Sequence, residues 1–254
     1  MSPAPLLMQL PSSHAVFEQE IDVGTSLRSE HLDDAAGPQS AVRIVVPRIV
    51  RPTPREDASP AMKARLLAVA AEHLRCLGSN GVTVRAVAAE VGLTHPSVYR
   101  YFTSKASLLD AVAGQWLVDV EAQLTRIVDA SDAAGDKIEH LLTALASIQH
   151  EALIDEPHLF AIYLDATVAA RPIARCHRVR LRNLVERVVE DGIATNAFVA
   201  RDPERAIAYI FDASYRFTHP LAIQQDAGMP RDLVDARLGT VILAIQKTLR
   251  AGTL

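Results

Sequence analysis

Cysteine, aromatic residues and long apolar runs are all scarce in this sequence. Only two of its 254 residues are cysteines, Cys76 and Cys176, and no Cys-x-x-Cys spacing occurs. A disulfide framework or a zinc site is therefore not expected, and both thiols suit a reduced, cytoplasmic protein. Aromatic residues make up only 5% of the chain, while Leu, Ala, Val and Ile dominate. That balance favours helices over a sheet-rich fold.

Signals for membranes and export are missing as well. No apolar run approaches the ~20 residues that a helix needs to span a bilayer, so we expect no membrane partner. The first residues contain no basic segment followed by an apolar one, which is the pattern of a signal peptide. Both observations again favour a cytoplasmic location.

The common signatures of catalysis are also absent. The sequence contains no Gly-rich phosphate loop, no GxSxG and no HExxH motif. Its adjacent carboxylates, such as Asp155-Glu156, resemble helix-end or surface charges. Five histidines stand at spacings that fit no common metal-ligand motif, namely His140, His150, His158, His177 and His219. We therefore expect no enzyme, no metal and no cofactor.

Basic residues are concentrated in one part of the chain. The formal net charge is −4, which argues against a general coat for nucleic acid. Residues 60–110 nevertheless carry six basic and three acidic side chains, a net charge of +3. Residues 111–254 carry fifteen basic and nineteen acidic side chains, a net charge of −4. The positive segment suits contact with a phosphate backbone, because neutralised phosphates supply affinity and steering.

Residues 81–105 predict two short helices joined by a tight turn. Thr83 is a hydroxyl N-cap for a helix over 84–90, whose apolar residues recur at spacings of three and four. Gly92 ends that helix, since glycine adopts a left-handed conformation without steric cost. Thr94 is a second hydroxyl N-cap, which begins the next helix.

The second of these helices is expected to present a polar outer face. Val98 and Phe102 are four residues apart and must face inward. The side chains that then point outward or lie on the flanks are those of His95, Pro96, Ser97, Tyr99 and Arg100. Short polar groups there can reach base edges in the major groove, while tyrosine hydroxyls and cations can hold phosphates. Lys105 begins a further helix, whose free N–H groups would complete a phosphate clamp.

This stretch resembles the helix-turn-helix of the TetR family of transcriptional regulators. Residue types, caps and spacing agree together over about fifty residues, from Ala61 to about Ala111, at Thr83, Gly92-Leu93-Thr94, Ser97, Val98-Tyr99, Tyr101-Phe102, Lys105 and Leu108-Leu109. The resemblance implies double-stranded DNA as a partner. Pro96 departs from the glycine or small residue that is common at its position.

The resemblance also implies a role for each residue of the motif. Tyr99 and Lys105 would contact phosphates, and Thr83 would be a phosphate-side cap. The residues that would face bases are Arg85, His95, Pro96 and Ser97. The predicted DNA-contacting set is completed by Thr94, Arg100 and Tyr101. The alternative interpretations are a helical hairpin packed in a core and, for His95, a flanking polar residue.

The rest of the chain predicts an all-α fold. A helix over 61–77 with a buried stripe of Leu66, Ala70, Leu74 and Leu77 completes a three-helix helix-turn-helix domain over 60–110. A long helix over 105–128 joins it to a helical domain over 111–254. The further expected helices cover 136–154, a short segment from 157, 172–193, 203 to about 219, and a segment from 230.

The first 59 residues have a different composition. Eight of the 14 prolines lie in residues 1–60, and no helical period is present, so we expect a largely disordered extension. Its stretch 41–55 contains four arginines and no acidic residue. It is interpreted as a solvated tail, as a basic arm that follows phosphates or enters the minor groove, or as a short strand. A translation start near Met62 is a further alternative.

The resemblance implies that the domain over 111–254 binds an effector and dimerises through its last two long helices. The broad apolar face of the last helix is compatible with a homodimer. The aromatic residues expected to line a cavity are Trp116, Phe160, Tyr163, Phe211 and Tyr215. Ordinary core packing is the alternative for each of them. Arginines crowd 175–187, which fits either an anionic ligand or a solvated helix face.

The function favoured by these observations is a ligand-responsive regulator of transcription. In this interpretation it is a repressor that binds a palindromic operator as a dimer. A constitutive DNA-binding dimer without a small-molecule effector is the alternative, and an activator also remains open.

Overall fold

The computed structural model describes residues 59–199 and 201–253, and their regular elements are all helices. The helices are α1 (Pro60–Gly81), α2 (Val84–Glu90), α3 (His95–Val98), α4 (Lys105–Val128), α5 (Ala134–Asp155), α6 (Pro157–Val168), α7 (Pro172–Ala194), α8 (Pro203–Thr218), α9 (Pro220–Gln225) and α10 (Arg231–Ala251). The all-α prediction is confirmed. The extension over 1–59 and its basic stretch 41–55 lie outside the described residues, apart from Ser59.

The first helix is longer than predicted and is kinked near its end. Leu66, Ala70 and Leu74 are buried as expected, but Leu77 is 59% exposed. The reason is a backbone change at Gly78, where φ is +69° and the helical path breaks. Gly78 itself takes the buried position, and a Cβ there would lie only 3.0 Å from Cε1 of His158. This close approach joins α1 to the first turn of α6.

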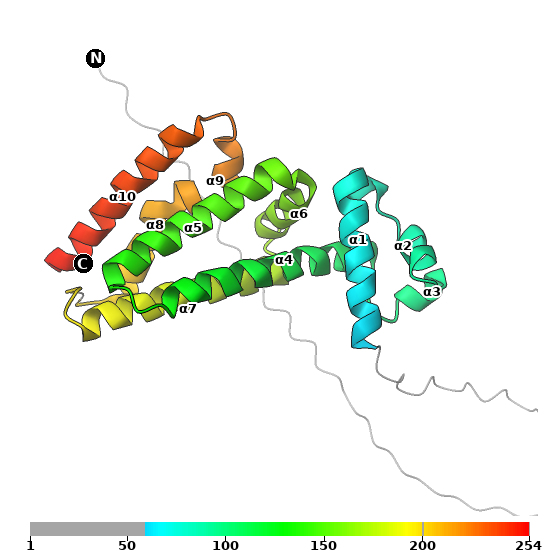
Figure 1. The fold of residues 1–254 in the computed structure, drawn as a ribbon, viewed down its shortest axis with the longest axis horizontal. Helices are drawn as coiled ribbons and strands as arrows, with labels where there is room; N and C mark the ends of the chain where they lie inside the picture. Colours follow the sequence, from blue (N-terminus) through cyan, green and yellow to red (C-terminus); the bar gives the residue numbers. More distant parts are fainter. Residues whose placement is uncertain (1–58, 200, 254) are drawn as a thin grey trace, which may run out of the picture. The chain divides into compact units, whose positions relative to one another are not determined.

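Helices α1, α2 and α3 share one core with the N-terminal half of α4, and α2 and α3 lie beside α1 (Figure 1). Thr83 caps α2 as predicted, since its hydroxyl accepts a hydrogen bond of 3.1 Å from the Ala86 N–H. Gly92 follows with φ of +76°, the left-handed conformation that the prediction requires. Val98 and Phe102 are both buried. We call this group, with the N-terminal half of α4, the head.

Helix α4 has the predicted bounds and contributes to two cores. Its N-terminal half adds Leu108 and Val112 to the core of the head, which also takes in Ile162 of α6. Its C-terminal half adds Val120 and Leu124 to the larger core of the helical bundle. One continuous helix therefore belongs to both cores.

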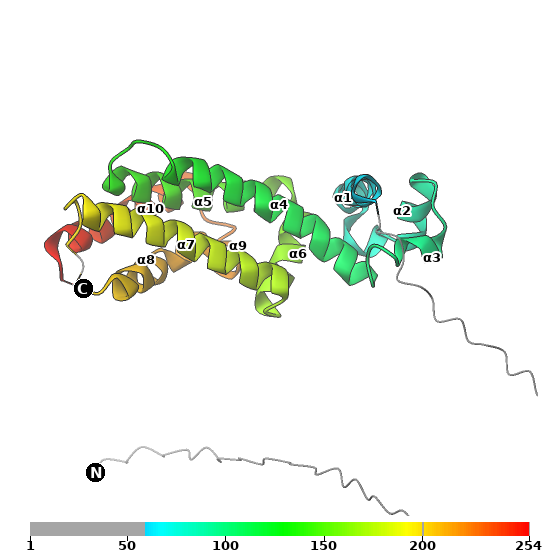
Figure 2. The same cartoon turned by 90° about the horizontal axis from the view of Figure 1, so that it is seen from below.

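The bundle core is built from α4, α5, α7, α8 and α10 (Figures 1 and 2). Prolines at the first helical position begin α6, α7 and α8, because a missing N–H costs nothing there. The short helix α9 was not predicted. His219 and Pro220 end α8 as expected, but the chain at once forms this further turn, whose Ile223 packs in a small core with Phe160.

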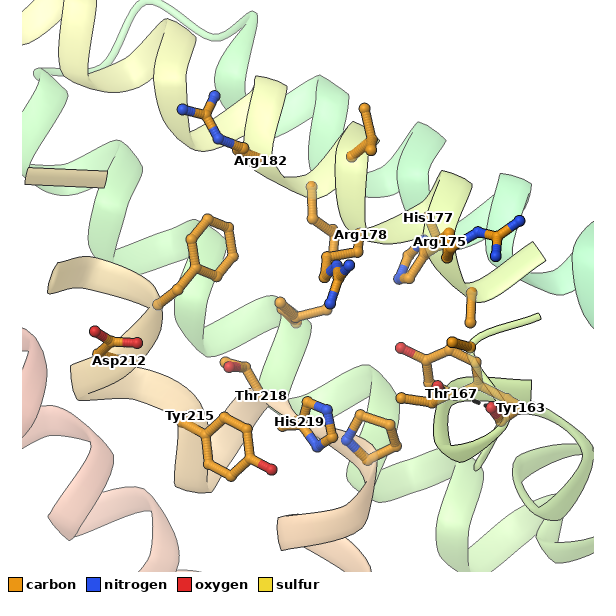
Figure 3. A pocket seen from close by; sticks show the side chains of 17 residues that line it. Tyr163, Thr167, Arg175, His177, Arg178, Arg182, Asp212, Tyr215, Thr218 and His219 are labelled. Atoms are coloured by element: carbon orange, nitrogen blue, oxygen red, sulfur yellow. Dashed lines mark hydrogen bonds between the residues drawn. The ribbon is translucent and has the colours of Figure 1, made fainter. Parts of the chain in front are cut away.

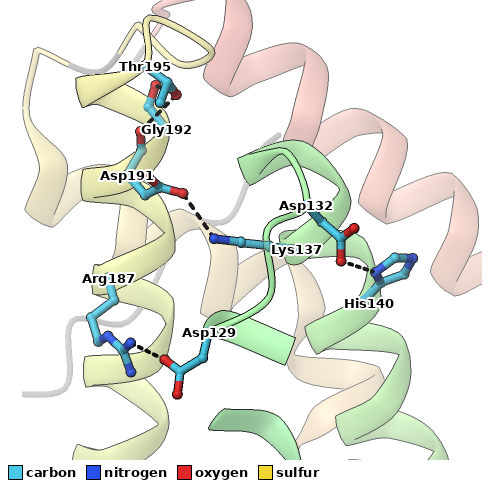
Figure 4. A network of polar contacts seen from close by, with 8 residues as sticks. All are labelled: Asp129, Asp132, Lys137, His140, Arg187, Asp191, Gly192 and Thr195. Carbon is cyan, nitrogen blue, oxygen red and sulfur yellow. Dashed lines mark hydrogen bonds and ion pairs between the residues drawn. The ribbon is translucent and has the colours of Figure 1, made fainter. Parts of the chain in front are cut away.

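Ion pairs fix the end of the bundle that lies away from the head (Figure 4). The largely buried Lys137 of α5 reaches Asp191 of α7 with an Nζ–Oδ2 distance of 3.2 Å. Arg187 of α7 pairs with Asp129, the residue that follows α4. Through these contacts, the residue that ends α4 and the first turn of α5 are both connected to α7.

Candidate functional site

The exposed surface of the head carries the residues predicted to contact DNA. Thr94, His95 and Pro96 are exposed at the start of α3, and Ser97 is half-buried. Helix α3 spans only four residues, after which the chain continues as a turn through Arg100. A short helix with free side chains at its N-terminus can bring polar groups to base edges.

Thr94 does not cap α3 in the way predicted. Its hydroxyl accepts no backbone N–H and instead lies 2.8 Å from the hydroxyl oxygen of Ser97. The two hydroxyls therefore hold each other in place at the helix start. Each keeps hydrogen-bonding capacity for another partner, since a hydroxyl has one donor and two acceptor positions.

His95 and Tyr99 form a pair on the flank of the same surface. Their rings meet edge to face, with centroids 5.1 Å apart, and the Tyr99 hydroxyl lies 3.3 Å from Nε2 of His95. Tyr99 is 43% exposed. The histidine thus orients a tyrosine hydroxyl that remains open to solvent.

The remaining predicted residues lie on neighbouring elements of the head. Thr83 and Arg85 are exposed at the start of α2, while Tyr101 and Lys105 are half-exposed. Lys105 is the first residue of α4 and lies within a reciprocal capping box that was not predicted. In this box Ser104 accepts from the backbone N–H of Ser107, and Ser107 accepts from that of Ser104, each at 3.0 Å.

The capping box limits the predicted phosphate clamp. Two of the amides at the start of α4 are already occupied by serine hydroxyls, so the clamp has fewer free N–H groups than expected. Lys105 supplies the positive charge at this helix start. A signal for the box was present in the sequence, because serines three positions apart can cap each other.

A cavity of about 600 Å³ lies within the bundle, between α7 and α8 (Figure 3). Of the five aromatic residues predicted to line a cavity, Tyr163, Phe211 and Tyr215 do so. Trp116 and Phe160 lie outside its wall. They pack edge to face against Tyr163, with centroid distances of 5.5 Å and 6.4 Å. Of these three contacting aromatic residues, Tyr163 alone lines the cavity.

The charged part of the cavity wall comes mainly from α7, for which the sequence left an anionic ligand and a solvated helix face as alternatives. Arg175, His177, Arg178 and Arg182 of α7 all line the cavity, as does His219 at the end of α8. The crowding of arginines over 175–187 was the available signal, but it did not show which of them face inward. Arg182 is already paired with Glu186, at 3.1 Å, and with Glu204.

His177 links the cavity to α4. Its Nδ1 lies 2.8 Å from Oε1 of Glu121, a residue of α4, and its ring meets that of Tyr163 edge to face. Burial lowers the pKa of His177 below its usual value, although the Glu121 carboxylate acts in the opposite direction. Arg180 completes the cluster through the other carboxylate oxygen of Glu121, at 2.8 Å.

Over residues 59–199 and 201–253, no three His, Cys, Asp or Glu side chains gather in a way that could hold a metal ion. None of the helices found there has both the length and the apolar character needed to cross a membrane.

A helix-turn-helix head with an exposed polar helix start, carried on a helical bundle with a cavity, defines the class of helix-turn-helix regulators. Two family profiles match the chain: one described as bacterial regulatory proteins, tetR family, over residues 66–112, and one described as tetracyclin repressor-like, C-terminal domain, over residues 134–241. The chain belongs to the TetR family and is a transcriptional regulator.

Curated relatives are similar over most of their length. The HTH-type transcriptional repressor KstR2 of Rhodococcus jostii (strain RHA1) is 28% identical over 172 residues, which cover 65% of this chain and 82% of the relative. KstR2 of Mycolicibacterium smegmatis is 26% identical over 151 residues, 58% of this chain and 71% of that protein.

Solved structures share the fold. A protein of unknown function from Rhodococcus sp. RHA1 has a TM-score of 0.57 at 23% identity, covering 78% of this chain and 99% of that one. RolR in complex with the ligand resorcinol has a TM-score of 0.52 at 19% identity, covering 74% and 87%. At such identities the likeness concerns the arrangement of helices alone.

Proposed function

We propose that this regulator is a ligand-responsive repressor that binds a palindromic operator as a homodimer. The observation that carries the proposal is the exposed start of α3, where Thr94, His95 and Pro96 are exposed and Ser97 is half-buried in a head of net positive charge. Arg85 and Arg100 flank this surface, and Lys105 begins the neighbouring helix. Base edges are contacted by His95, Pro96, Ser97 and Arg85, and phosphates by Tyr99 and Lys105.

The dimer interface is formed by α8 and α10. In support, α10 exposes an apolar face on which Leu233 is 44% and Leu243 56% exposed, with Gly239 between them. A symmetric interface of small and apolar side chains pairs this face with its copy. The twofold axis then places two heads on two half-sites of a palindrome.

Repression and ligand response are supported by relatives and by the cavity. KstR2 is a repressor, and RolR was solved with resorcinol bound. In this chain the cavity-lining helix α7 is bonded to α4 through His177 and Glu121. A ligand that prefers one arrangement of α7 against α4 shifts the population toward it, and the spacing of the two heads changes.

The test of this function is selection of bound sequences from a random pool of duplex DNA. We expect an enriched palindrome that binds two chains, and release from it when the right metabolite fraction is added. A palindrome that no metabolite releases would support the constitutive DNA-binding dimer instead. The DNA-binding proposal itself is rejected if the selection enriches no site at low ionic strength, where phosphate contacts are strongest.

A further inference from the structure

A single guanidinium points into the cavity without a carboxylate partner. Figure 3 shows the Arg178 side chain in the middle of the cavity, whereas the guanidinium groups of Arg175 and Arg182 point away from its centre. Arg182 is neutralised by Glu186 and Glu204. Among the described side chains, none forms an ion pair with Arg178.

His219 provides a second polar group on the opposite wall. Its ring stacks on that of Tyr215, with centroids 4.4 Å apart, which fixes its orientation. Its Nδ1 is buried and has no hydrogen-bond partner in the described part of the chain. Burial and the nearby charge of Arg178 lower the pKa of His219, which favours the neutral ring, and that ring can donate one hydrogen bond.

The rest of the wall between these two groups is largely apolar. Leu145, Leu181 and Phe211 line it from three different helices. Asp212 is the carboxylate of the lining, and Figure 3 shows that it lies well apart from Arg178, beside the backbone of α8. The cavity therefore has a cationic centre and an apolar wall.

We propose that the cavity binds an organic acid, whose anionic group pairs with Arg178 and accepts a hydrogen bond from His219 while its apolar part packs against Leu145, Leu181 and Phe211. This inference rests on the proposed ligand response and adds the chemical class of the ligand. A volume of about 600 Å³ is within the range of small-molecule sites, roughly 300–1,000 Å³. A neutral ligand would cover the guanidinium without replacing its lost hydration, which is unfavourable.

The experiment compares acids with a neutral molecule of the same chain length on the full-length protein. Decanoate, decyl phosphate and decanol, all below their aggregation concentrations, compete with the fluorescent probe 8-anilinonaphthalene-1-sulfonate. The variants are Arg178→Met, which removes the charge, Arg178→Lys, which keeps it, and Arg175→Met as the matched control one helical turn away. Both arginine side chains are exposed, and neither is part of the buried core, so their replacement leaves the fold intact.

We expect at least one acid to bind ten-fold or more tightly than decanol to the wild type. Arg178→Met should abolish this preference, Arg178→Lys should restore part of it, and Arg175→Met should leave it within about three-fold. The two acids distinguish a carboxylate ligand from a phosphate ligand. Equal affinity for acids and decanol would overturn the inference while leaving a ligand-binding regulator in place.

Two other outcomes also decide the matter. If none of the three molecules displaces the probe, the inference is overturned, and the ligand response of the proposed function is weakened with it. If the acid preference persists in Arg178→Met, the anionic group binds elsewhere and the inference is again wrong. Operator selection is independent of all these results, so the DNA-binding part of the proposal stands or falls by itself.

Discussion

His177 and Glu121 join the wall of the cavity to the helix that carries the head. The Nδ1 of His177 on α7 lies 2.8 Å from Oε1 of Glu121 on α4, and both side chains are largely buried. A second contact of the same kind lies nearer the head, where Arg171 binds Asp110 at 2.5 Å and the carbonyl oxygen of Ile162 at 3.0 Å. Helix α7 and Arg171, the residue that precedes it, are thus bonded to α4 at two levels.

The first prediction concerns the transmission of ligand binding. Glu121→Ala removes the carboxylate that His177 contacts, so ligand should still bind within about three-fold but should no longer release DNA. The coupling factor between ligand and operator, typically 5- to 150-fold in allosteric proteins, should fall toward one. The measurement is operator affinity with and without the tightest-binding acid of the competition experiment.

The matched control for this prediction is Arg180→Ala. It removes the other, more exposed partner of Glu121 and leaves the contact with His177 in place. Coupling should therefore persist in Arg180→Ala. Equal loss of coupling in both variants would show that Glu121 acts through its ion pair with Arg180 and not through His177.

The second prediction is that acid destabilises the bundle through His177. Its folded-state pKa is lowered by burial, so the unfolded state binds protons more readily. The stabilisation is therefore complete above the unfolded pKa of about 6.5 and is lost as pH falls below it. From pH 7.5 to 5.5 the cost should be up to about 1.4 kcal/mol for this group. Urea unfolding at the two pH values measures it.

Replacement of His177 by Gln is the comparison for the pH experiment. Glutamine can still contact Glu121 but does not titrate, so the difference in unfolding free energy between pH 7.5 and 5.5 should shrink. His219 acts in the same direction, because burial and Arg178 lower its pKa too. An unchanged pH dependence in His177→Gln would assign the effect to other groups.

The third prediction is a change in the salt dependence of DNA binding. Lys105→Ala removes one phosphate contact per head, so the slope of log affinity against log salt should fall by about one unit per half-site. The control, Arg126→Ala, removes an exposed charge from the opposite end of the same helix. Its slope should equal that of the wild type. A wild-type slope in Lys105→Ala would show that Lys105 does not contact a DNA phosphate.

The fourth prediction separates base contacts from phosphate contacts. Ser97→Ala and substitutions of Arg85 should alter which sequences are selected, at a cost of about 1–3 kcal/mol for the preferred base. Tyr99→Phe removes only a hydroxyl and should weaken all sequences about equally. Repeating the random-pool selection with each variant makes the comparison. If Ser97→Ala selects the same consensus sequence, the Ser97 hydroxyl contacts Thr94 and no base.

The fifth prediction tests the packing of α7. A Cβ added at Gly192 would lie 2.1 Å from Cδ2 of Phe198, which is itself buried. Gly192→Ala should therefore destabilise the protein by about 1–3 kcal/mol through overpacking. In the control, Gly114→Ala on α4, the nearest atom is at 3.9 Å, so this variant should be neutral or more stable. Thermal unfolding of the two variants gives the answer.

Local signals predicted the helix boundaries well. Thr83, Gly92 and the prolines that begin α6, α7 and α8 act on their own backbone neighbours, so their effect is readable in sequence. The bounds of α4 were predicted for the same reason. Leu77 was misplaced, because its helix kinks at a glycine that a distant histidine approaches. Thr94 was misjudged because a neighbouring hydroxyl competes with the backbone for it.

The sequence by itself determined an all-α regulator of the TetR family, since caps, apolar periodicity and a focused basic segment are local properties. Only the tertiary structure decided which side chains meet across helices. It placed Arg178 rather than Arg175 in the middle of the cavity, excluded Trp116 and Phe160 from its wall, and bonded His177 to Glu121. The physical reason is that helical periodicity fixes which residues share a face, while the packing of neighbouring helices fixes what that face meets.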